Sequence, residues 1–279
     1  MKWNDIITPI EHFSAKEMAD FMRQSPLGSY ELLDVRQPAE YAEGHLPGAR
    51  LIPLDQLLQG QFDFDPRHTL LIYCRAGNRS LAAAQYLNQM NSGRVVNLVG
   101  GIMAWEDKMA TGPYEHNLQL FDPETEFEDA LSLAYAMEEG LRRFYISLGE
   151  RITDPKSQKL LEQLAEFEEN HKASLDASSN LPQGPKTHPL HGKILETGSL
   201  VDELLGRVEC FINGPLDVFD FAMGIEAQAF DFYMRLSYRA EEEESSHLFR
   251  DLAEEELTHL DLLVQESKAF HRSMNSGLN

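Results

Sequence analysis

The spacing of apolar residues changes near residue 112 of the chain. Before that point, short runs rich in β-branched and aromatic residues alternate with helical segments, which is typical of a parallel sheet in an α/β domain. Ser14 and Glu17 have the spacing of a capping box and predict the start of one helix. The predicted strands cover residues 30–35, 50–54, 69–74 and 94–99. From about Phe127 the apolar residues recur with the 3.6-residue period of amphipathic helices, predicted at residues 127–150, 157–178, 215–240 and 245–271.

Gly112, Pro113 and Pro123 separate these two patterns, as residues of a linker commonly do. We therefore expect an α/β domain with a parallel sheet over residues 1–110, a linker over residues 111–124, and an all-α domain over residues 125–279. A turn-rich stretch over residues 178–192 lies between the second and third long helices. It is long enough for the crossover of a four-helix bundle whose middle two helices run parallel.

Composition and charge exclude several classes of protein. The chain has 279 residues, 42% of them hydrophobic, which is enough for two cores. A net charge of −22 repels phosphate backbones and anionic lipids, so we expect no nucleic-acid or membrane partner. The first twenty residues resemble no signal peptide, and we expect a cytoplasmic protein. Two cysteines are too few for a disulfide framework, a four-thiolate zinc site or a rubredoxin-type iron centre.

Cys74 is the first candidate for chemistry. It follows an apolar run over residues 70–73 and precedes a loop and a helix predicted from Ser80 to Met90. In such a strand–loop–helix segment the loop amides and the helix N-terminus point toward the sulfur, and Arg75 and Arg79 add positive potential. These features lower a thiol pKa and favour a nucleophilic thiolate. A lone cysteine is also often a buried apolar residue, so the loop alone leaves both interpretations open.

Three segments of the first part together resemble the single-domain rhodaneses, namely LLDVRQPAEYAEGHLPGARLIPL, LIYCRAGNRSLAAAQYL and VVNLVGGIMAW. The resemblance covers nearly all of residues 1–110. It implies that Cys74 carries a persulfide, which the backbone amides of the loop Cys74–Arg79 surround. It also implies that Asp34 and Arg36 brace the structure around the site.

Other residues of the resemblance are interpreted as structural. His45, Gly48 and Trp105 match positions typical of the family. The phosphatase relatives of the rhodaneses have five residues between the cysteine and the arginine, whereas four separate Cys74 from Arg79. Sulfur transfer is therefore favoured over phosphate ester hydrolysis.

An internal repeat with an offset of 88 residues runs through the helical part. Each half holds Glu-x6-Tyr on its first helix and Glu-x-x-His on its second. Because seven residues make almost two helical turns and three make just under one, each pair shares one helical face. The repeated pairs are Glu138 and Glu226, Tyr145 and Tyr233, Glu168 and Glu256, and His171 and His259.

The repeated residues lie on the apolar faces of their helices, so four glutamates should point into the core. An unpaired buried carboxylate costs several kcal/mol or becomes protonated. No lysine or arginine shares those faces, whereas two divalent cations would balance four negative charges. One inward Glu or His alone is more often satisfied by a hydrogen bond, but six at duplicated spacing predict a dinuclear metal site.

This set of residues resembles that of the ferritin-like carboxylate di-metal proteins, in particular the rubrerythrins and bacterioferritins, over roughly residues 125–270. The resemblance implies two iron ions per chain, and the donor atoms would also accept Mn or Zn. Glu168 and Glu256 would bridge the ions. Tyr145 and Tyr233 would donate hydrogen bonds to the carboxylates, or else serve only as core aromatics. The implied ligands are Glu138, Glu168, His171, Glu226, Glu256 and His259.

Two departures separate the chain from the rubrerythrins. Many of those proteins have a further glutamate three residues after the third-helix ligand, where this chain has Ala229. The chain also lacks the cysteines of a rubredoxin module. The symmetric site is therefore closer to the bacterioferritin pattern.

The sequence predicts a rhodanese-type sulfurtransferase joined to a di-iron oxidoreductase that acts on peroxide or oxygen. Small sulfur donors and acceptors and an external electron donor would be its partners, and we expect a homodimer. The alternative is a protein that stores iron or senses redox state, with a first domain that does not turn over. Catalytic rather than single consumption of peroxide by the reduced, metal-loaded protein distinguishes the two.

Several further residues are interpreted as inert. Cys210 is expected to be a packed thiol, and Glu241–Glu244 to form a solvated junction between helices. His188 and His191, between prolines and glycines, are expected to be exposed loop residues without a function.

Overall fold

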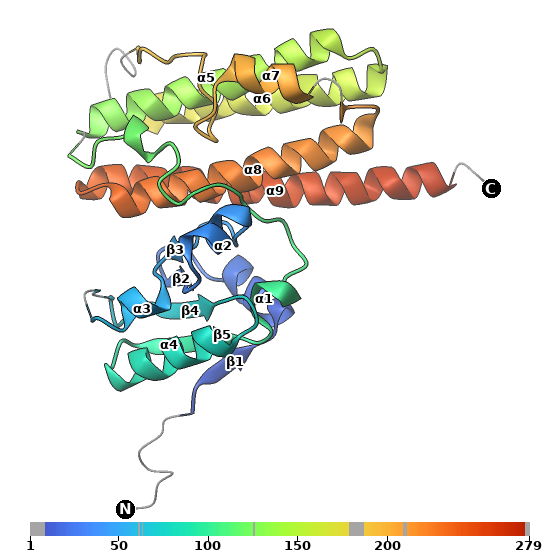
Figure 1. Ribbon diagram of the computed structural model, residues 1–279. Coiled ribbons are helices and arrows are strands. Elements are labelled where there is room, and N and C mark those ends of the chain that lie inside the picture. The colour runs from blue at the N-terminus through green and yellow to red at the C-terminus, as the bar shows by residue number, and fades with distance from the viewer. Residues whose placement is uncertain are drawn as a thin grey trace, which may run out of the picture. The chain divides into compact units, whose positions relative to one another are not determined.

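Figure 1 shows the computed structural model of the chain, which describes residues 9–60, 62, 64–124, 126–178, 187–208 and 211–276. Residue contacts divide the chain into two compact units, Met1–His116 and Asn117–Asn279. The first, called the α/β unit below, is built on a sheet. The second, called the helical unit, has helices as its regular structure over the described residues.

The α/β unit contains a five-stranded sheet in the order β1-β5-β4-β2-β3, and every neighbouring pair is parallel. The strands are β1 (Glu11–Phe13), β2 (Tyr30–Asp34), β3 (Arg50–Leu51), β4 (Thr69–Tyr73) and β5 (Arg94–Leu98). The helices are α1 (Ala15–Gln24), α2 (Pro38–Glu43), α3 (Leu54–Leu57) and α4 (Asn78–Gln89), followed by the 3₁₀ turn Gly101–Ala104. The predicted parallel α/β fold is confirmed, and so is the capping box of Ser14 and Glu17.

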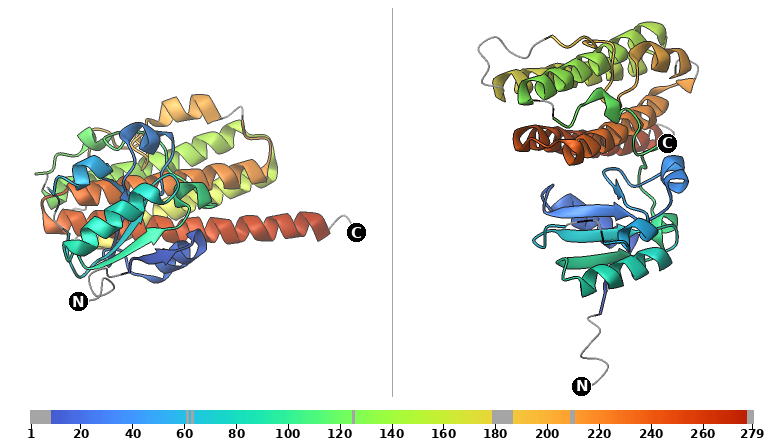
Figure 2. Two further views of the ribbon diagram at one scale, coloured as in Figure 1. Left: turned by 60° about the horizontal axis from the view of Figure 1, so that its bottom comes forward. Right: turned by 60° about the vertical axis from the view of Figure 1, so that its left-hand side comes forward.

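Successive side chains of the strands pack on opposite faces of the sheet. Leu33 and Ile72 lie in the cluster that includes α3 and α4. Leu32 and Leu71 lie in the cluster that includes α1 and α2. The sheet is thus covered on both faces (Figure 2), which explains why its strands are continuous apolar runs rather than alternating ones.

Three details of the α/β unit differ from the prediction. Strand β3 is shorter than residues 50–54, because Pro53 lacks the N–H that a ladder needs and α3 begins directly after it. Strand β1 was not predicted, since it is a three-residue edge strand with polar Glu11 and His12. Helix α4 begins at Asn78, two residues earlier than predicted.

The helical unit contains the four long helices that the sequence predicts. They are α5 (Phe127–Arg151), α6 (Pro155–Ser178), α8 (Pro215–Arg239) and α9 (Glu243–Ser276), and the short helix α7 (Val201–Val208), which was not predicted, precedes α8. Helix α5 packs along α6 and α8 packs along α9, and contacts of α6 with α8 and of α5 with α9 connect the two pairs. Buried apolar residues from all five of these helices form a shared core.

The second half of the predicted linker packs within the helical unit. Leu118 and Phe121 are buried, and the Phe121 ring meets the Phe249 ring of α9 edge-on at 5.0 Å. Two large apolar side chains cannot remain solvated at low cost, so this segment joins the helical core.

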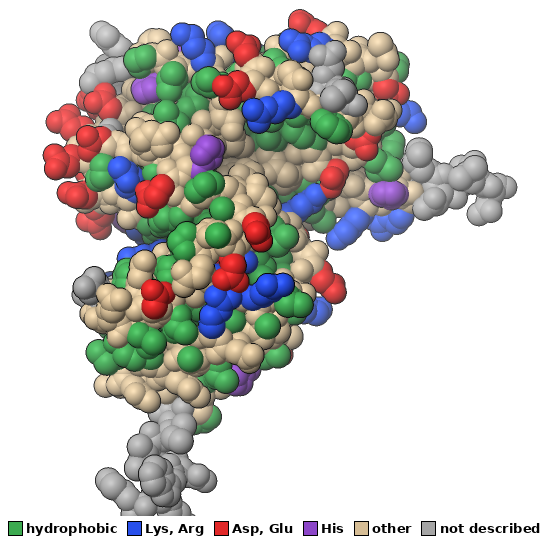
Figure 3. All heavy atoms as spheres, in the orientation of Figure 1, with side chains coloured by type: hydrophobic (Ala, Val, Ile, Leu, Met, Phe, Trp, Pro, Cys, Tyr) green, Lys and Arg blue, Asp and Glu red, His purple; other side chains and the backbone are tan. Residues whose placement is uncertain are grey.

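The residues interpreted as inert have different outcomes. Glu241–Glu244 are exposed where α8 gives way to α9, as predicted, and acidic side chains gather over that end of the helical unit (Figure 3). Cys210 lies outside the described residues. His188 and His191 are half-buried rather than exposed, because the segment that follows residue 187 folds against α5, where the His191 ring stacks on Tyr135. Over the described residues, no helix has the length and apolar character needed to cross a bilayer.

Candidate functional site

Cys74 lies in the turn between β4 and α4. Its side chain is buried, and the Gly77 N–H donates a hydrogen bond to Sγ at 3.1 Å. Gly77 has a φ of 93°, which favours glycine, and α4 begins at the next residue. The Ser80 hydroxyl lies 3.4 Å from Sγ and 3.2 Å from the Gly77 carbonyl, so two acceptors share its proton.

These contacts favour the thiolate of Cys74. Burial raises the pKa of the thiol, but hydrogen bonds from the Ser80 side chain and from the amides of Ser80, Ala76 and Gly77 outweigh burial and lower the pKa. A lowered thiol pKa at the N-terminus of a helix is the usual setting of a nucleophilic cysteine. Ser80 was not predicted, although its position directly after the loop would have suggested it.

The two arginines of the loop behave differently. Arg79 donates two hydrogen bonds of 2.7 Å to the Glu40 carboxylate, which is why the pKa of Glu40 falls to about 2. The Arg79 charge also interacts with Cys74. Arg75 is exposed. Sequence reasoning did not identify Glu40, which fixes the position of Arg79.

Asp34 and Arg36 form a buried pair. The Arg36 Nε lies 3.0 and 2.9 Å from the two Asp34 oxygens, and Nη2 donates to the Gly44 carbonyl at 2.7 Å. This pair joins the end of β2 to the residue that follows α2, which agrees with a bracing role.

Gly101 shapes the other side of the cysteine loop. A Cβ on Gly101 would lie 2.3 Å from the Cys74 carbonyl, so only glycine permits this approach. The Ile102 N–H then donates to that carbonyl at 2.8 Å. Elsewhere, the His45 ring stacks on Tyr41 at 3.6 Å and Trp105 packs on the core, in line with their structural interpretation.

In the helical unit, the six predicted ligands come together in two sets. Each set takes a glutamate from one helix and Glu-x-x-His from the helix beside it. His171 Nδ1 lies 3.0 Å from Glu138 Oε2 and 3.5 Å from Glu168 Oε2. His259 Nδ1 lies 3.9 Å from Glu226 Oε2 and 3.8 Å from Glu256 Oε2.

Buried oxygens without a partner test whether these residues fit metal ions. Among the described residues, Glu168 Oε2, Glu226 Oε2 and both Glu256 oxygens are buried and receive no hydrogen bond. Burial, followed by repulsion between the carboxylates, holds the pKa of Glu168 and Glu256 well above the usual range. Orphaned carboxylate oxygens beside imidazole nitrogens are a donor set that Fe, Mn and Zn accept, so the residues fit two divalent cations.

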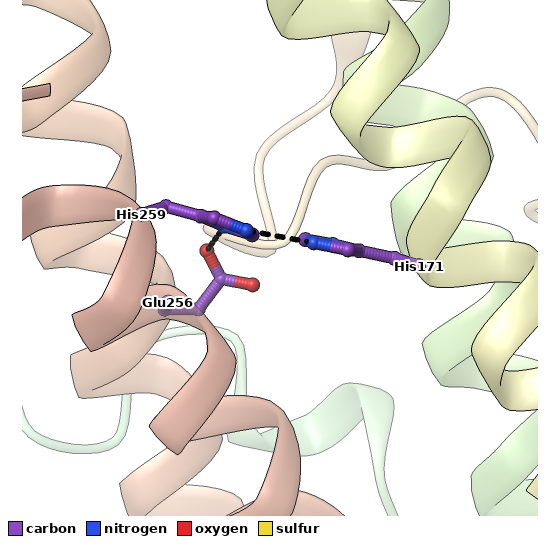
Figure 4. Close-up of side chains that lie close together, drawn as sticks. All are labelled: His171, Glu256 and His259. Carbon is purple, nitrogen blue, oxygen red and sulfur yellow. Dashed lines mark hydrogen bonds and ion pairs between the residues drawn. The ribbon is translucent and has the colours of Figure 1, made fainter. Parts of the chain in front are cut away.

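The two histidines approach each other from α6 and α9 (Figure 4). Their Nε2 atoms are 2.9 Å apart, so one donates a hydrogen bond to the other. Burial opposes protonation of His171, yet its hydrogen bond to Glu138 raises its pKa, whereas burial and the charge of His171 lower the pKa of His259 to about 4. Both Nδ1 atoms face the carboxylates.

The repeated tyrosines cross between the two halves of the repeat. The Tyr145 hydroxyl lies 3.4 Å from Glu226 Oε1, and the Tyr233 hydroxyl lies 3.2 Å from Glu138 Oε1. Each tyrosine thus donates to the glutamate of the other half rather than to that of its own helix.

A fifth glutamate, which the sequence did not predict, reaches the same core. Glu196 is fully buried in the segment between α6 and α7. It belongs to no repeated pair, so a search by repeat could not find it. The only available signal was one acidic residue beside Ile194 and Leu195.

Comparison with known proteins concerns the α/β unit. Residues 14–108 match the rhodanese-like domain family. A protein of Allochromatium vinosum named "Sulfurtransferase" is 39% identical over 93 residues, which are 33% of this chain and 79% of that protein. The "Putative sulfur carrier protein YrkF" of Bacillus subtilis is 32% identical over 80 residues, 29% of this chain and 43% of that protein. The crystal structure of a rhodanese-like domain protein from Staphylococcus aureus is 29% identical, covers 37% of this chain and 98% of that chain, and has a TM-score of 0.33.

Proposed function

The chain belongs to the rhodanese-like family through residues 14–108, and from this premise we propose that it is a sulfurtransferase that carries sulfur as a persulfide on Cys74. The observation that supports this proposal most is the hydrogen bonding of Sγ by the Gly77 amide and the Ser80 hydroxyl. The same donors would stabilise the anionic outer sulfur of a persulfide. The names of the two relatives agree with sulfur transfer.

The reaction has two steps. The Cys74 thiolate attacks the outer sulfur of a donor such as thiosulfate, a new S–S bond forms, and sulfite leaves with the electron pair of the bond that breaks. An acceptor nucleophile then attacks the outer sulfur of the persulfide and regenerates the thiolate. The exposed Arg75 would attract anionic donors, and Arg79, held by Glu40, would add positive potential near the sulfur.

Replacement of the nucleophile tests this function. The Cys74→Ser variant should lose thiosulfate-to-cyanide sulfur transfer and keep the metal content of the wild type. Cys210→Ser, which changes the other cysteine, should retain the activity. Persistent transfer by Cys74→Ser contradicts the assignment.

For the helical unit, we propose a dinuclear iron site in a ferritin-like four-helix bundle that serves as an oxidoreductase for peroxide or oxygen. Glu138 and His171 would hold one ion, Glu226 and His259 would hold the other, and Glu168 and Glu256 would bind both. The buried carboxylate oxygens without partners support this proposal. Two reduced iron ions would supply one electron each to the oxidant. Tyr145 and Tyr233 would orient the terminal glutamates through their hydroxyl groups.

Iron storage or redox sensing is the competing function of the same site. Peroxide consumption distinguishes the two. The reduced, iron-loaded protein, supplied with an electron donor, should consume many equivalents of peroxide per site if it is an oxidoreductase. Consumption that stops after one equivalent per site favours storage or sensing.

A further inference from the structure

The segment that carries Glu196 is a compact turn. Ile194 and Leu200 pair across it, and the Leu195 N–H donates to the Ser199 carbonyl at 2.8 Å. Gly198, with a φ of 74°, lets the turn close. The position of Glu196 is therefore set by backbone hydrogen bonds within the turn.

The turn packs against α5 beside the predicted ligands. A Cβ on Gly140 would lie 1.6 Å from the Ile194 carbonyl oxygen, so only glycine at this position of α5 allows the turn to approach. Gly140 lies two residues after Glu138. The close approach places Glu196 in the core that holds the metal-ligand candidates.

The Glu196 carboxylate faces both halves of the repeat. Its ligand atoms lie within 4.8 Å of those of Glu138, Glu168 and His171, and also within 4.8 Å of those of Glu226 and Glu256. Its side chain is fully buried, and over the described residues neither oxygen receives a hydrogen bond. An ionised carboxylate in this environment requires a cation.

A neighbouring glutamate shows how this unit neutralises a buried carboxylate by protein groups alone. Glu139, next to Glu138 on α5, is also buried, and the side chains of Arg142, Arg143 and Lys172 donate to it at 2.7 to 3.0 Å. Neither oxygen of Glu196 receives a hydrogen bond from the described residues. The difference indicates that its counter-charge comes from outside the protein.

We propose that Glu196 is a fifth carboxylate ligand, which binds both metal ions from the turn between α6 and α7. This inference rests on the dinuclear site proposed above. On this proposal, the turn and the missing Cβ of Gly140 bring one ligand from outside the repeat to a position between the two symmetric sets of ligands.

The negative charge of a fifth carboxylate would affect the oxidation state of the bound metal ions. Four carboxylates balance two divalent ions, whereas five balance one divalent and one trivalent ion. Glu196 should therefore stabilise the more oxidised forms of an iron pair relative to the same site without it.

Metal binding to the full-length protein tests the proposal. Metal-free protein is titrated with Co²⁺, with calorimetry for affinity and stoichiometry and visible absorption for coordination number. The wild type should bind two Co²⁺ per chain. Glu196→Gln, which leaves an amide that cannot bridge as a carboxylate does, should bind at least one Co²⁺ roughly 10- to 100-fold more weakly and change the absorption spectrum.

Two further variants and one further measurement separate a ligand from a structural residue. Glu203→Gln removes one negative charge from the exposed face of α7 and should leave affinity and spectrum unchanged. Metal-free Glu196→Gln should melt at a higher temperature than the metal-free wild type at neutral pH, because an unpartnered buried charge has been removed. A structural role for Glu196 predicts a lower melting temperature and contradicts the proposal.

The outcomes separate this inference from the proposed function. A wild type that binds fewer than two Co²⁺ at saturation contradicts the dinuclear site itself. A wild type that binds two, with Glu196→Gln identical in affinity and spectrum, contradicts only the role of Glu196. If Glu196→Gln does not fold, Glu196→Asp replaces it in the test. This variant keeps the charge but has a shorter side chain, and it should show the same loss of Co²⁺ affinity.

Discussion

The two candidate sites treat negative charge in opposite ways. At Cys74, backbone and hydroxyl donors from Gly77 and Ser80 already point at the sulfur. In the helical unit, Glu168, Glu196 and Glu256 contribute buried oxygens that receive no hydrogen bond from the described residues. The first site is complete as a folded polypeptide, whereas the second has an excess of acceptors.

The difference follows from the kind of ligand that each site is proposed to hold. A thiolate or persulfide is an anion, so the protein supplies donors, and a helix N-terminus supplies them without any charged side chain. A pair of cations requires anionic oxygens, and their mutual repulsion lowers stability until the cations bind. The two units should therefore respond differently to chelators, substitution and pH.

Metal removal should produce the largest difference between the units. At about 100 times its Kd, each ion adds ~2.7 kcal/mol to the stability of the state that binds it, so two ions should raise the melting temperature of the helical unit by roughly 10 °C or more. Calorimetric unfolding of the full chain, with metal and with a chelator, measures the shift. The transition of the α/β unit should not move, and an equal shift in both transitions contradicts the comparison.

The sequence could predict which residues form the symmetric part of the proposed metal site. The 88-residue repeat identified Glu138, His171 and their counterparts because helical periodicity converts spacing directly into a shared face. It could not identify Glu196, whose position depends on a turn and on the missing Cβ of Gly140. Such a close approach between distant segments leaves no periodic signal in the sequence.

The α/β unit shows the same limit. The apolar runs predicted the central strands, since burial on both faces requires continuous apolar sequence. Strand β1 and the pairing of Arg79 with Glu40 could not be predicted, because each depends on a partner 39 or more residues away. Ser80 could have been inferred from its place one turn into α4, where a hydroxyl can face the loop.

Substitution of a proposed bridging ligand should have the next largest effect. Glu168→Ala and Glu256→Ala should each lose most of the bound iron, because one bridge contributes to both ions. His188→Ala and His191→Ala are matched controls from the segment before the Glu196 turn and should keep both ions. Elemental analysis after saturation with iron measures the loss, and a Glu168→Ala protein that retains two ions per chain would falsify the bridging role.

A smaller effect is expected at the sulfur site from the loss of one donor. The pKa of the Cys74 thiol is lowered, so its thiolate should be present at a lower pH than that of an ordinary cysteine. Ser80→Ala should raise the pH of half-maximal alkylation by about 0.5 to 1 unit, the equivalent of one weakened hydrogen bond to a charged group. Iodoacetamide rates against pH in a Cys210→Ser background measure the shift, and an unchanged profile excludes Ser80 as a donor to the thiolate.

The smallest effect should come from Glu40→Gln, which releases Arg79. This pair is partly exposed, so its loss should change the free energy of unfolding by only about 0.2 to 1 kcal/mol at neutral pH. The pKa of Glu40 is lowered from 4.5 to about 2 in the folded protein, so the contribution is present above pH 4.5 and is lost as the pH falls toward 2. Denaturant unfolding of wild type and variant should therefore differ in free energy at pH 7 and converge near pH 2.

The Glu40→Gln variant should also change the reactivity of Cys74. Because Arg79 no longer has its carboxylate partner, the pH of half-maximal alkylation of Cys74 should fall slightly, which is the opposite direction to Ser80→Ala. A midpoint that rises in Glu40→Gln shows instead that Arg79 acts on the sulfur only when Glu40 holds it in place.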